Sequence, residues 1–281
     1  MKIPRKITVR NIKPGEMQIV EQWGANEGWN PGIRDGECYL AGDTSGFFIA
    51  EADGEPVGCV FAINFSDEFC MGGVYIVIPE YRGGRVGVAL QRRVAIHAGN
   101  RVAGIDAVEN KVKNYSFFGF KSAYKIIRYE MAARPAGKEI KTVDLTEYPF
   151  EKLTGYDRQF FPADRTKLMS EWIKQKPSGT ALGIIKNGAL TGYGVIRKAY
   201  HGYRLEPMYA EDRETAEDLL LALVDRAEPG APVYLNIPMP NAAACELTEK
   251  YNMKAVISLV RMYTRAIPEN TSLPKVYSQM G

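Results

Sequence analysis

The chain of 281 residues repeats part of its own pattern about halfway along its length. Segments 46–62 and 180–196 each contain two apolar runs joined by a glycine-containing turn, the pattern of a β-hairpin. The turn glycines of the two segments are displaced by 134 positions (188 minus 54 and 192 minus 58). Segments 120–128 and 253–261 also correspond, at an offset of 133 (253 minus 120). Two separated matches at nearly the same offset predict two similar folding units.

The join between the two units is expected around Arg134-Pro-Ala-Gly-Lys138, where proline and glycine interrupt the structured pattern. A chain of this length is long for one domain, and 46% hydrophobic residues provide core material for two. In the second half, helices are predicted at 165–175 and 214–226. The fold class expected is therefore two α/β units, each with a sheet flanked by helices.

Residues 76–87 read Ile-Val-Ile-Pro-Glu-Tyr-Arg-Gly-Gly-Arg-Val-Gly, an apolar strand that runs into a basic, glycine-rich turn. Val86, Leu90 and Val94 follow at helical spacing, which predicts a helix over 86–98. The first N–H groups of a helix have no partner within it, and the helix dipole favours an anion at the same place. The stretch therefore predicts an anion-binding site; the alternative is a basic loop before a surface helix.

The elements after this turn follow a definite order. A strand is predicted at 102–108, then a short helix that carries Tyr115 ahead of the pair Gly119-Phe120, and then a strand at 125–132. This order, with these residues, resembles the GNAT superfamily of acyl-CoA-dependent N-acetyltransferases. In that family a tyrosine stands four residues before a Gly-Phe pair, as Tyr115 does here.

The glycine-rich turn resembles the GNAT turn that binds the coenzyme A pyrophosphate through its amides. That turn reads Arg or Gln, two residues, Gly, one residue, then Gly or Ala; Arg82 and Gly87 match its ends, whereas Arg85 stands at the middle glycine and Gly84 comes one place early. The resemblance implies acetyl-CoA as cofactor, held by residues of the strand, the turn and the following short helix. These are Ile76, Val77, Ile78, Arg82, Gly83, Gly84, Arg85, Val86, Gly87, Val88, Asn110, Tyr115 and Phe118.

The resemblance makes Tyr115 the catalytic acid. A phenol with an ordinary pKa near 10 stays protonated at neutral pH and can donate to a leaving thiolate. The alternative is a core tyrosine on an amphipathic helix. The carbonyl oxygen of the thioester needs a backbone N–H donor, for which Val77 or Ile78 is the candidate.

A base, or a water relay, must take the proton of the attacking amine, because an alkylamine is charged at neutral pH. The strand at 73–78 contains no carboxylate, so candidates come from elsewhere, and each is also typical of a solvated surface acid. The candidates are Asp67, Glu68, Asp106 and Glu109.

A helix is predicted at 16–28, and several helix-breaking residues follow it. The connection after this helix borders the acceptor groove in the GNAT fold, so the resemblance implies that Trp29, Asn30 and Asp35 bind the substrate. A structural turn packed by Trp29 is the alternative.

The second half lacks the residues that bind coenzyme. Its counterpart of the glycine-rich turn, residues 211–218, is acidic and has no glycine, so it would repel a pyrophosphate. Thr248 stands where the tyrosine would be. We therefore expect residues 1–134 to form a catalytic GNAT acetyltransferase domain and residues 141–281 a degenerate GNAT-like domain that lines the acceptor site. The resemblance implies that each sheet is mixed, mostly antiparallel and twisted.

Composition narrows the possible partners. A net charge of +3 without a long basic run argues against nucleic acid, and the absence of an apolar run of about 18 residues or of a signal pattern argues against a membrane and for the cytoplasm. The four cysteines lack metal-type spacing and are expected to be reduced, and neither histidine has a partner pattern, so no metal is expected.

The sequence thus predicts an N-acetyltransferase that carries an acetyl group from acetyl-CoA to a primary amine by direct attack in a ternary complex. The acceptor is a small amine or a protein or peptide amine. Two alternatives remain: a non-catalytic sensor that binds acyl-CoA, and a transferase of a larger acyl or aminoacyl group.

Overall fold

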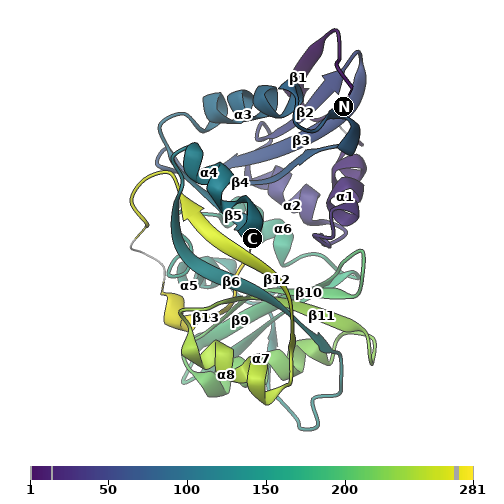
Figure 1. The fold of residues 1–281 in the computed structure, drawn as a ribbon. Coiled ribbons are helices and arrows are strands. Elements are labelled where there is room, and N and C mark those ends of the chain that lie inside the picture. The colour runs from purple at the N-terminus through teal and green to yellow at the C-terminus, as the bar shows by residue number, and fades with distance from the viewer. Residues whose placement is uncertain (1, 14, 269–271, 281) are drawn as a thin grey trace.

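The computed structural model describes residues 2–13, 15–268 and 272–280. Helices and strands alternate along both halves of the chain (Figure 1). The first half contains β1 (Ile7–Asn11), α1 (Met17–Asn26), α2 (Asp35–Gly42), β2 (Phe47–Ala52), β3 (Glu55–Asn64), β4 (Phe69–Val77), α3 (Arg85–Ala98), β5 (Val102–Val108), α4 (Val112–Phe117) and β6 (Lys121–Ala132). The second half contains β7 (Val143–Asp144), α5 (Phe150–Asp157), α6 (Thr166–Trp172), β8 (Gly179–Lys186), β9 (Ala189–Lys198), β10 (Tyr203–Ala210), α7 (Arg213–Val224), β11 (Pro232–Pro238), α8 (Ala242–Lys250), β12 (Lys254–Tyr263) and β13 (Val276–Ser278).

The elements predicted around the glycine-rich turn are confirmed. Helix α3 begins at Arg85, one residue before the predicted start, ends at Ala98 as predicted, and is followed by Gly99, whose φ of 59° suits a residue without a side chain. Strand β5 has the predicted bounds, while β6 begins four residues earlier than predicted (125 minus 121). The two repeated segments form the hairpins β2–β3 and β8–β9.

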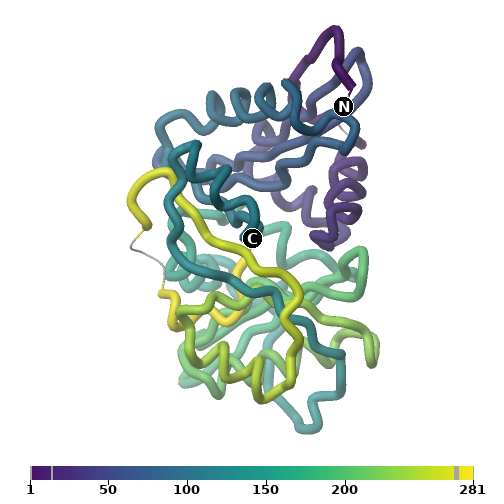
Figure 2. The backbone as a smooth tube through the Cα atoms, viewed as in Figure 1, coloured from purple at the N-terminus to yellow at the C-terminus, as the bar shows by residue number. Residues whose placement is uncertain are grey.

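The strands of the described residues form one mixed sheet whose order is symmetric about its centre. That order is β1-β2-β3-β4-β5-β12-β6-β11-β10-β9-β8-β7, with β13 beside β10. Strand β12 of the second half lies between β5 and β6, and β6 of the first half lies beside β11. Each half therefore gives its last long strand to the sheet of the other. Figure 2 shows these two strands running between the lobes, and they pair antiparallel to each other.

Helices cover both faces of the first-half sheet because successive apolar side chains of its strands point to opposite faces. Phe48 on β2 packs in a cluster with Val86 and Leu90 of α3, whereas the next residue, Ile49, packs in a cluster with Val20 of α1 on the opposite face. A further apolar cluster joins the halves, since it includes residues of α2, β2 and β3 together with residues of α5, α6 and β9. The two halves therefore share part of one core.

Strands β4 and β5 pair in parallel only over Phe69–Met71 and Val102–Gly104, and no pairing continues beyond that point. Past it, β4 carries a bulge opposite β3, and Val74 within the bulge has a φ of 48°, unusual for a β-branched residue. The thiol of Cys59 donates to the Val74 carbonyl at 3.5 Å. The bulge and the end of the pairing together shape the centre of the first-half sheet.

The corresponding gap in the second half is filled. Strands β10 and β11 pair only at Tyr203–Arg204 and Val233–Tyr234, and β13 lies along β10 beyond that point. The Ser278 hydroxyl donates to the Leu205 carbonyl, and its oxygen accepts the Asn236 N–H. The second half thus closes with its own chain the space that stays open in the first.

Candidate active site

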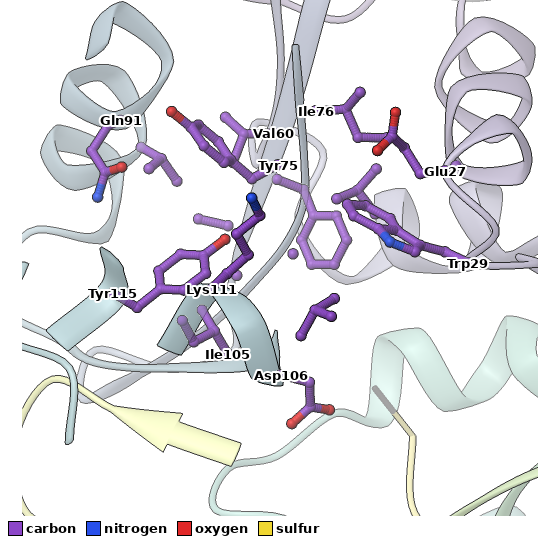
Figure 3. Close-up of a pocket in the computed structure, with 18 of the residues that line it drawn as sticks. Glu27, Trp29, Val60, Tyr75, Ile76, Gln91, Ile105, Asp106, Lys111 and Tyr115 are labelled. Atoms are coloured by element: carbon purple, nitrogen blue, oxygen red, sulfur yellow. The ribbon is translucent and has the colours of Figure 1, made fainter. Parts of the chain in front are cut away.

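A cavity of about 1080 Å³ lies where β4 and β5 part (Figure 3). Its walls come from α1, α3, α4 and the strands β3, β4 and β5 of the first half. The second half closes it with residues of β10, β11 and β12. The cavity therefore extends from the N-terminus of α3 to the junction between the halves.

The glycine-rich turn opens onto one end of this cavity. Gly83 has a φ of 73°, and Gly84 precedes α3 without a side chain that could cap the helix. Both glycines line the cavity, as does Gly87 in the first turn of the helix. A side chain at position 87 would meet the Tyr75 hydroxyl, 2.6 Å from the place of its Cβ. The uncapped N–H groups at the start of α3 suit an anionic group of the coenzyme.

The equivalent helix of the second half, α7, is capped by its own chain. The carboxylate of Asp212 accepts the N–H of Thr215 at 2.7 Å, in the place that an anion would take. With β13 beside β10, the described residues of the second half leave neither the start of α7 nor the space between β10 and β11 open for coenzyme.

The two arginines of the turn differ in position. Arg82 lines the cavity, donates through Nε to the Val77 carbonyl at 2.7 Å and forms an ion pair with Glu27 at the end of α1. Arg85 lies outside the cavity lining and donates to the Pro4 carbonyl at 3.1 Å. Only Arg82 is therefore placed to contact a ligand in the cavity directly.

Tyr115 enters the cavity from α4. Its ring packs edge-on against Phe120, with ring centroids 5.9 Å apart, and the structure assigns its hydroxyl no hydrogen bond to any described residue. Burial, with a smaller effect from nearby Tyr75, raises the pKa of Tyr115 to about 12. The hydroxyl therefore keeps its proton, and Figure 3 shows it directed into the cavity with the Lys111 side chain nearby.

The structure distinguishes between the two candidates for the backbone donor at the end of β4. Ile78 is not part of the cavity lining, and its N–H donates to the Val57 carbonyl at 3.0 Å. Ile76 and Val77 line the cavity. Of the two predicted donors, Val77 alone stays a candidate.

The four carboxylates predicted as bases are mostly remote from the cavity. Asp67, Glu68 and Glu109 are exposed and do not line it. Asp106 does line it, but both of its oxygens accept hydrogen bonds from Arg261. The Arg261 guanidinium therefore already occupies the carboxylate oxygens that would have to accept a proton from the amine.

Glu21 is a cavity residue that sequence reasoning did not select. It lies on α1 with 9% of its surface exposed and accepts a hydrogen bond from the Gly36 N–H. Burial and the nearby Asp35 carboxylate raise the pKa of Glu21 to about 7. A carboxylate with this pKa can take and release a proton near neutral pH. Its position on the buried side of a predicted helix was the one sequence signal.

The predicted substrate contacts fall into two groups. Trp29 and Asp35 line the cavity. Asn30 does not; its side chain exchanges two hydrogen bonds with the backbone of His201, at 2.7 and 2.8 Å, and so joins the halves. Asp35 is buried and accepts a paired hydrogen bond from Arg197.

The inner end of the cavity contains a buried network of charges. Arg197 pairs with Asp35 and with Glu206, and Arg204 donates to Glu206 at 2.8 Å. Burial alone would raise the pKa of Glu206, but Arg204 and Arg197 hold it below its ordinary value. Arg128 donates to the Trp29 carbonyl at 2.7 Å. This end of the cavity is therefore polar, in contrast to the apolar walls of β4 and β5.

Two family models, each described as an acetyltransferase (GNAT) domain, match the chain over residues 43–122 and 153–278. The chain belongs to the GNAT superfamily. Among solved structures, a putative acetyltransferase from Pyrococcus horikoshii has a TM-score of 0.83 at 22% identity and covers 100% of this chain and 96% of its own. A tandem GNAT protein from the clavulanic acid biosynthesis pathway has a TM-score of 0.64 at 14% identity, covering 94% of this chain and 100% of its own.

A curated relative is the Holothin acyltransferase of Pseudoalteromonas sp. (strain SANK 73390). It is 27% identical over 263 residues, which are 90% of this chain and 86% of the relative. The protein is thus a tandem GNAT acyltransferase. No helix in the described part of the chain is long and apolar enough to cross a membrane, and these residues contain no cluster suited to a metal ion.

The structure brings most of the predicted GNAT site residues together in one cavity. Four lie outside its lining: Asn30, Ile78, Arg85 and Val86. The others line it: Trp29, Asp35, Ile76, Val77, Arg82, Gly83, Gly84, Gly87, Val88, Asn110, Tyr115 and Phe118. Their roles toward coenzyme and acceptor stay predictions.

Proposed function

We propose that the protein transfers an acetyl group from acetyl-CoA to a primary amine by direct attack in a ternary complex. One observation carries this proposal: the uncapped N-terminus of α3 and the unpaired Tyr115 hydroxyl open onto the same cavity. A helix end of this kind suits the pyrophosphate of coenzyme A, and the phenol suits the sulfur at its other end.

The residues of the chain fit this coenzyme. The amides around Gly83, Gly84 and Gly87 would hold its pyrophosphate, with Arg82 contributing charge once it exchanges Glu27 for phosphate. Bound acyl-coenzyme A supplies an activated thioester. A donor of this kind and four free cysteines agree with a place in the cytoplasm.

Two side chains would handle the protons. Glu21 would accept the proton of the acceptor amine, directly or through water, since its pKa of about 7 leaves much of it ionised near neutral pH. Tyr115 Oη would give its proton to the leaving sulfur, because a pKa of about 12 keeps it protonated. The Val77 N–H would donate to the carbonyl oxygen of the thioester.

Transfer of a larger acyl group is the second candidate. The cavity of about 1080 Å³ has apolar walls that include Phe61, Ile105 and Leu259, which could accommodate a longer chain. The name of the Pseudoalteromonas relative specifies an acyltransferase acting on holothin without specifying an acyl length. The length of the acyl chain on the donor therefore has to be determined separately from the identity of the acceptor.

The test is calorimetric titration with acetyl-CoA and longer acyl-CoAs, followed by release of free thiol with a panel of amines. Binding of acetyl-CoA with turnover of at least one primary amine supports the proposal. Preference for a longer acyl-CoA favours the second candidate. Binding without turnover across the panel would instead identify an acyl-CoA sensor and overturn both.

A further inference from the structure

The charged network at the inner end of the cavity contains more positive than negative groups. Its three buried arginines are Arg128, Arg197 and Arg204, and its two buried carboxylates are Asp35 and Glu206. Burial of an unbalanced charge costs free energy unless a partner compensates it. One positive charge of this network therefore has no counterpart within it.

Arg197 does not carry the unbalanced charge. It donates to both oxygens of Asp35, to the Glu206 carboxylate at 2.8 Å and to the Glu206 carbonyl at 3.1 Å, and its guanidinium stacks over Trp172. It also lies outside the cavity lining. Arg197 is thus a structural residue that joins α2 to β10.

Arg128 and Arg204 are the arginines that line the cavity, and both have unused capacity. Arg128 is 7% exposed, donates to neutral oxygens of Asn236 and Trp29, and forms no ion pair with any described carboxylate. Arg204 is 6% exposed, and its Nε is buried without a hydrogen-bond partner. Buried polar groups are nearly always satisfied, so the Nε of Arg204 and the uncompensated charge of Arg128 both favour a further partner.

The two guanidinium groups converge on one point. Both donate to the Trp29 carbonyl, Arg128 at 2.7 Å and Arg204 at 3.1 Å, so their heads lie side by side at the cavity wall. Burial and the neighbouring Arg204 lower the pKa of Arg128, as expected for two like charges held together. The other cavity carboxylates do not cancel this charge, because Asp106 is paired with Arg261, Glu27 is paired with Arg82, and Glu21 forms no ion pair with any described arginine.

We propose that Arg128 and Arg204 bind a carboxylate of the acceptor, so that the substrate is an amino acid or another amine that carries a carboxylate. This inference rests on the proposed function, which supplies the amine. A planar carboxylate matches the fork of a guanidinium, and a single negative charge balances the network. Bound there, the carboxylate orients the amine of the acceptor toward the opening between β4 and β5.

The experiment compares amines with and without the carboxylate. The acceptors are glycine, β-alanine, γ-aminobutyrate and L-phenylalanine, each beside its amide, and kcat/KM is measured for wild type and for Arg128→Gln. The acid-to-amide ratio of the best pair should fall by roughly tenfold or more in the variant, with the KM for acyl-CoA unchanged. The amine pKa differs between an acid and its amide, but this difference affects wild type and variant equally, so it cancels when their acid-to-amide ratios are compared.

Arg101→Gln is the matched control, because Arg101 also lines the cavity but is paired with Asp67 and donates to the Ser66 carbonyl. Its acid-to-amide ratio should equal that of wild type. If Arg128→Gln does not fold by circular dichroism, Arg128→Lys, which keeps the charge and loses the fork, should also lower the ratio. An unchanged ratio in the Arg128 variant, or turnover of neutral amines alone, overturns the proposal.

A separate binding measurement distinguishes failure of this inference from failure of the proposed function. If no amine is acylated, the N-acetyl derivatives of the same four acids and of their amides are titrated into the protein by calorimetry. If an acid binds to wild type and does not bind to Arg128→Gln, the carboxylate site is supported even though the transferase function is not. Absence of binding to every acid would overturn the site as well.

Discussion

Two side chains of the cavity have pKa values displaced in the direction that acyl transfer needs. Tyr115 is held protonated and Glu21 is poised near neutrality, although both shifts begin with the same cause, burial. Burial disfavours the charged form of an acid, so it makes a phenol a more persistent proton donor and a carboxylate a stronger base. One apolar cavity can thus serve both proton transfers.

Replacement of Tyr115 by phenylalanine should lower kcat by about 100-fold or more, because general acids contribute effects of that size. Coenzyme affinity measured by calorimetry should remain close to that of wild type. Tyr75→Phe is the matched control, since the Tyr75 hydroxyl lies against Gly87, and it should have a much smaller effect on kcat. Equal losses in the two variants would remove Tyr115 from the mechanism.

Replacement of Glu21 by glutamine should abolish the acidic limb of kcat/KM near pH 7. The stability effect has a defined sign. Because folding raises this pKa from 4.5 to about 7, the native state favours the protonated form and loses stability as pH rises through that interval, by up to about 3 kcal/mol. Urea unfolding should therefore find Glu21→Gln more stable than wild type at pH 8 and similar at pH 4. A wild-type pH profile in the variant would exclude Glu21 as the base.

Sequence reasoning selected Tyr115 as a candidate and did not select Glu21, for a physical reason. The spacing from Tyr115 to Gly119-Phe120 is local and readable, whereas the raised pKa of Glu21 depends on burial and on Asp35, which the fold brings close from the next helix. Arg128 and Arg204 were missed for the same reason, because β6 and β10 lie far apart in the sequence. Local motifs predict which residues carry chemistry, but long-range packing determines which charges are buried together.

At the scale of single elements, the bulge in β4 depends on close packing with β3. Gly58 of β3 pairs with Val77, just beyond the bulge, and a Cβ at position 58 would lie 2.6 Å from the Ile76 carbonyl oxygen and 3.2 Å from Leu90. The carbonyl is a backbone atom and cannot rotate away as a flexible side chain can. A glycine here allows β3 to approach the strand that forms the wall of the cavity.

Gly58→Ala should therefore lower the free energy of unfolding by about 1 to 3 kcal/mol and also lower turnover, because β4 must move. Gly155→Ala is the control: Gly155 lies in α5, and no atom lies within 4 Å of the place that its Cβ would take, so alanine should raise stability by up to about 1 kcal/mol. Denaturant midpoints measure both. A Gly58→Ala protein with wild-type midpoint and turnover would contradict the close approach.

Helices and strands with a clear apolar periodicity were predictable from the sequence, whereas the pairing of the strands in the sheet was not. The apolar spacing of α3 and the apolar run of β5 gave bounds within a residue of those observed. The exchange of β6 and β12 leaves no signal in the sequence, because the same strand pattern suits either partner. Strand β13 has three residues, too few for a period to be read.

At the scale of the molecule, the strand exchange makes the halves interdependent. Without residues 141–281, β5 would lose β12 and β6 would lose both of its neighbours, β11 and β12. The apolar cluster that includes Phe61 and Trp172 would also be divided. The boundary at 134–141 therefore separates the chain into two similar sequences without separating the fold into two independent cores.

The full chain should unfold in a single cooperative transition in calorimetry, because neither half retains a complete sheet alone. Residues 1–134 and 141–281 expressed separately should each fail to show a cooperative transition, and coexpression of the two should restore a complex that binds acyl-CoA. Two separate transitions in the full chain, or a folded 1–134 fragment that binds acyl-CoA, would refute this interdependence.

The strand exchange also bears on how such a gene can evolve. A duplicated copy that no longer binds its own ligand is normally free to accumulate damage or to be deleted. Here deletion of the second copy would remove a strand from beside β5, next to the cavity, so selection for activity in the first copy also preserves the second. Retained for its strand, the second copy can diverge at Arg204 and Glu206, which line the cavity, without changing the glycine-rich turn of the first copy.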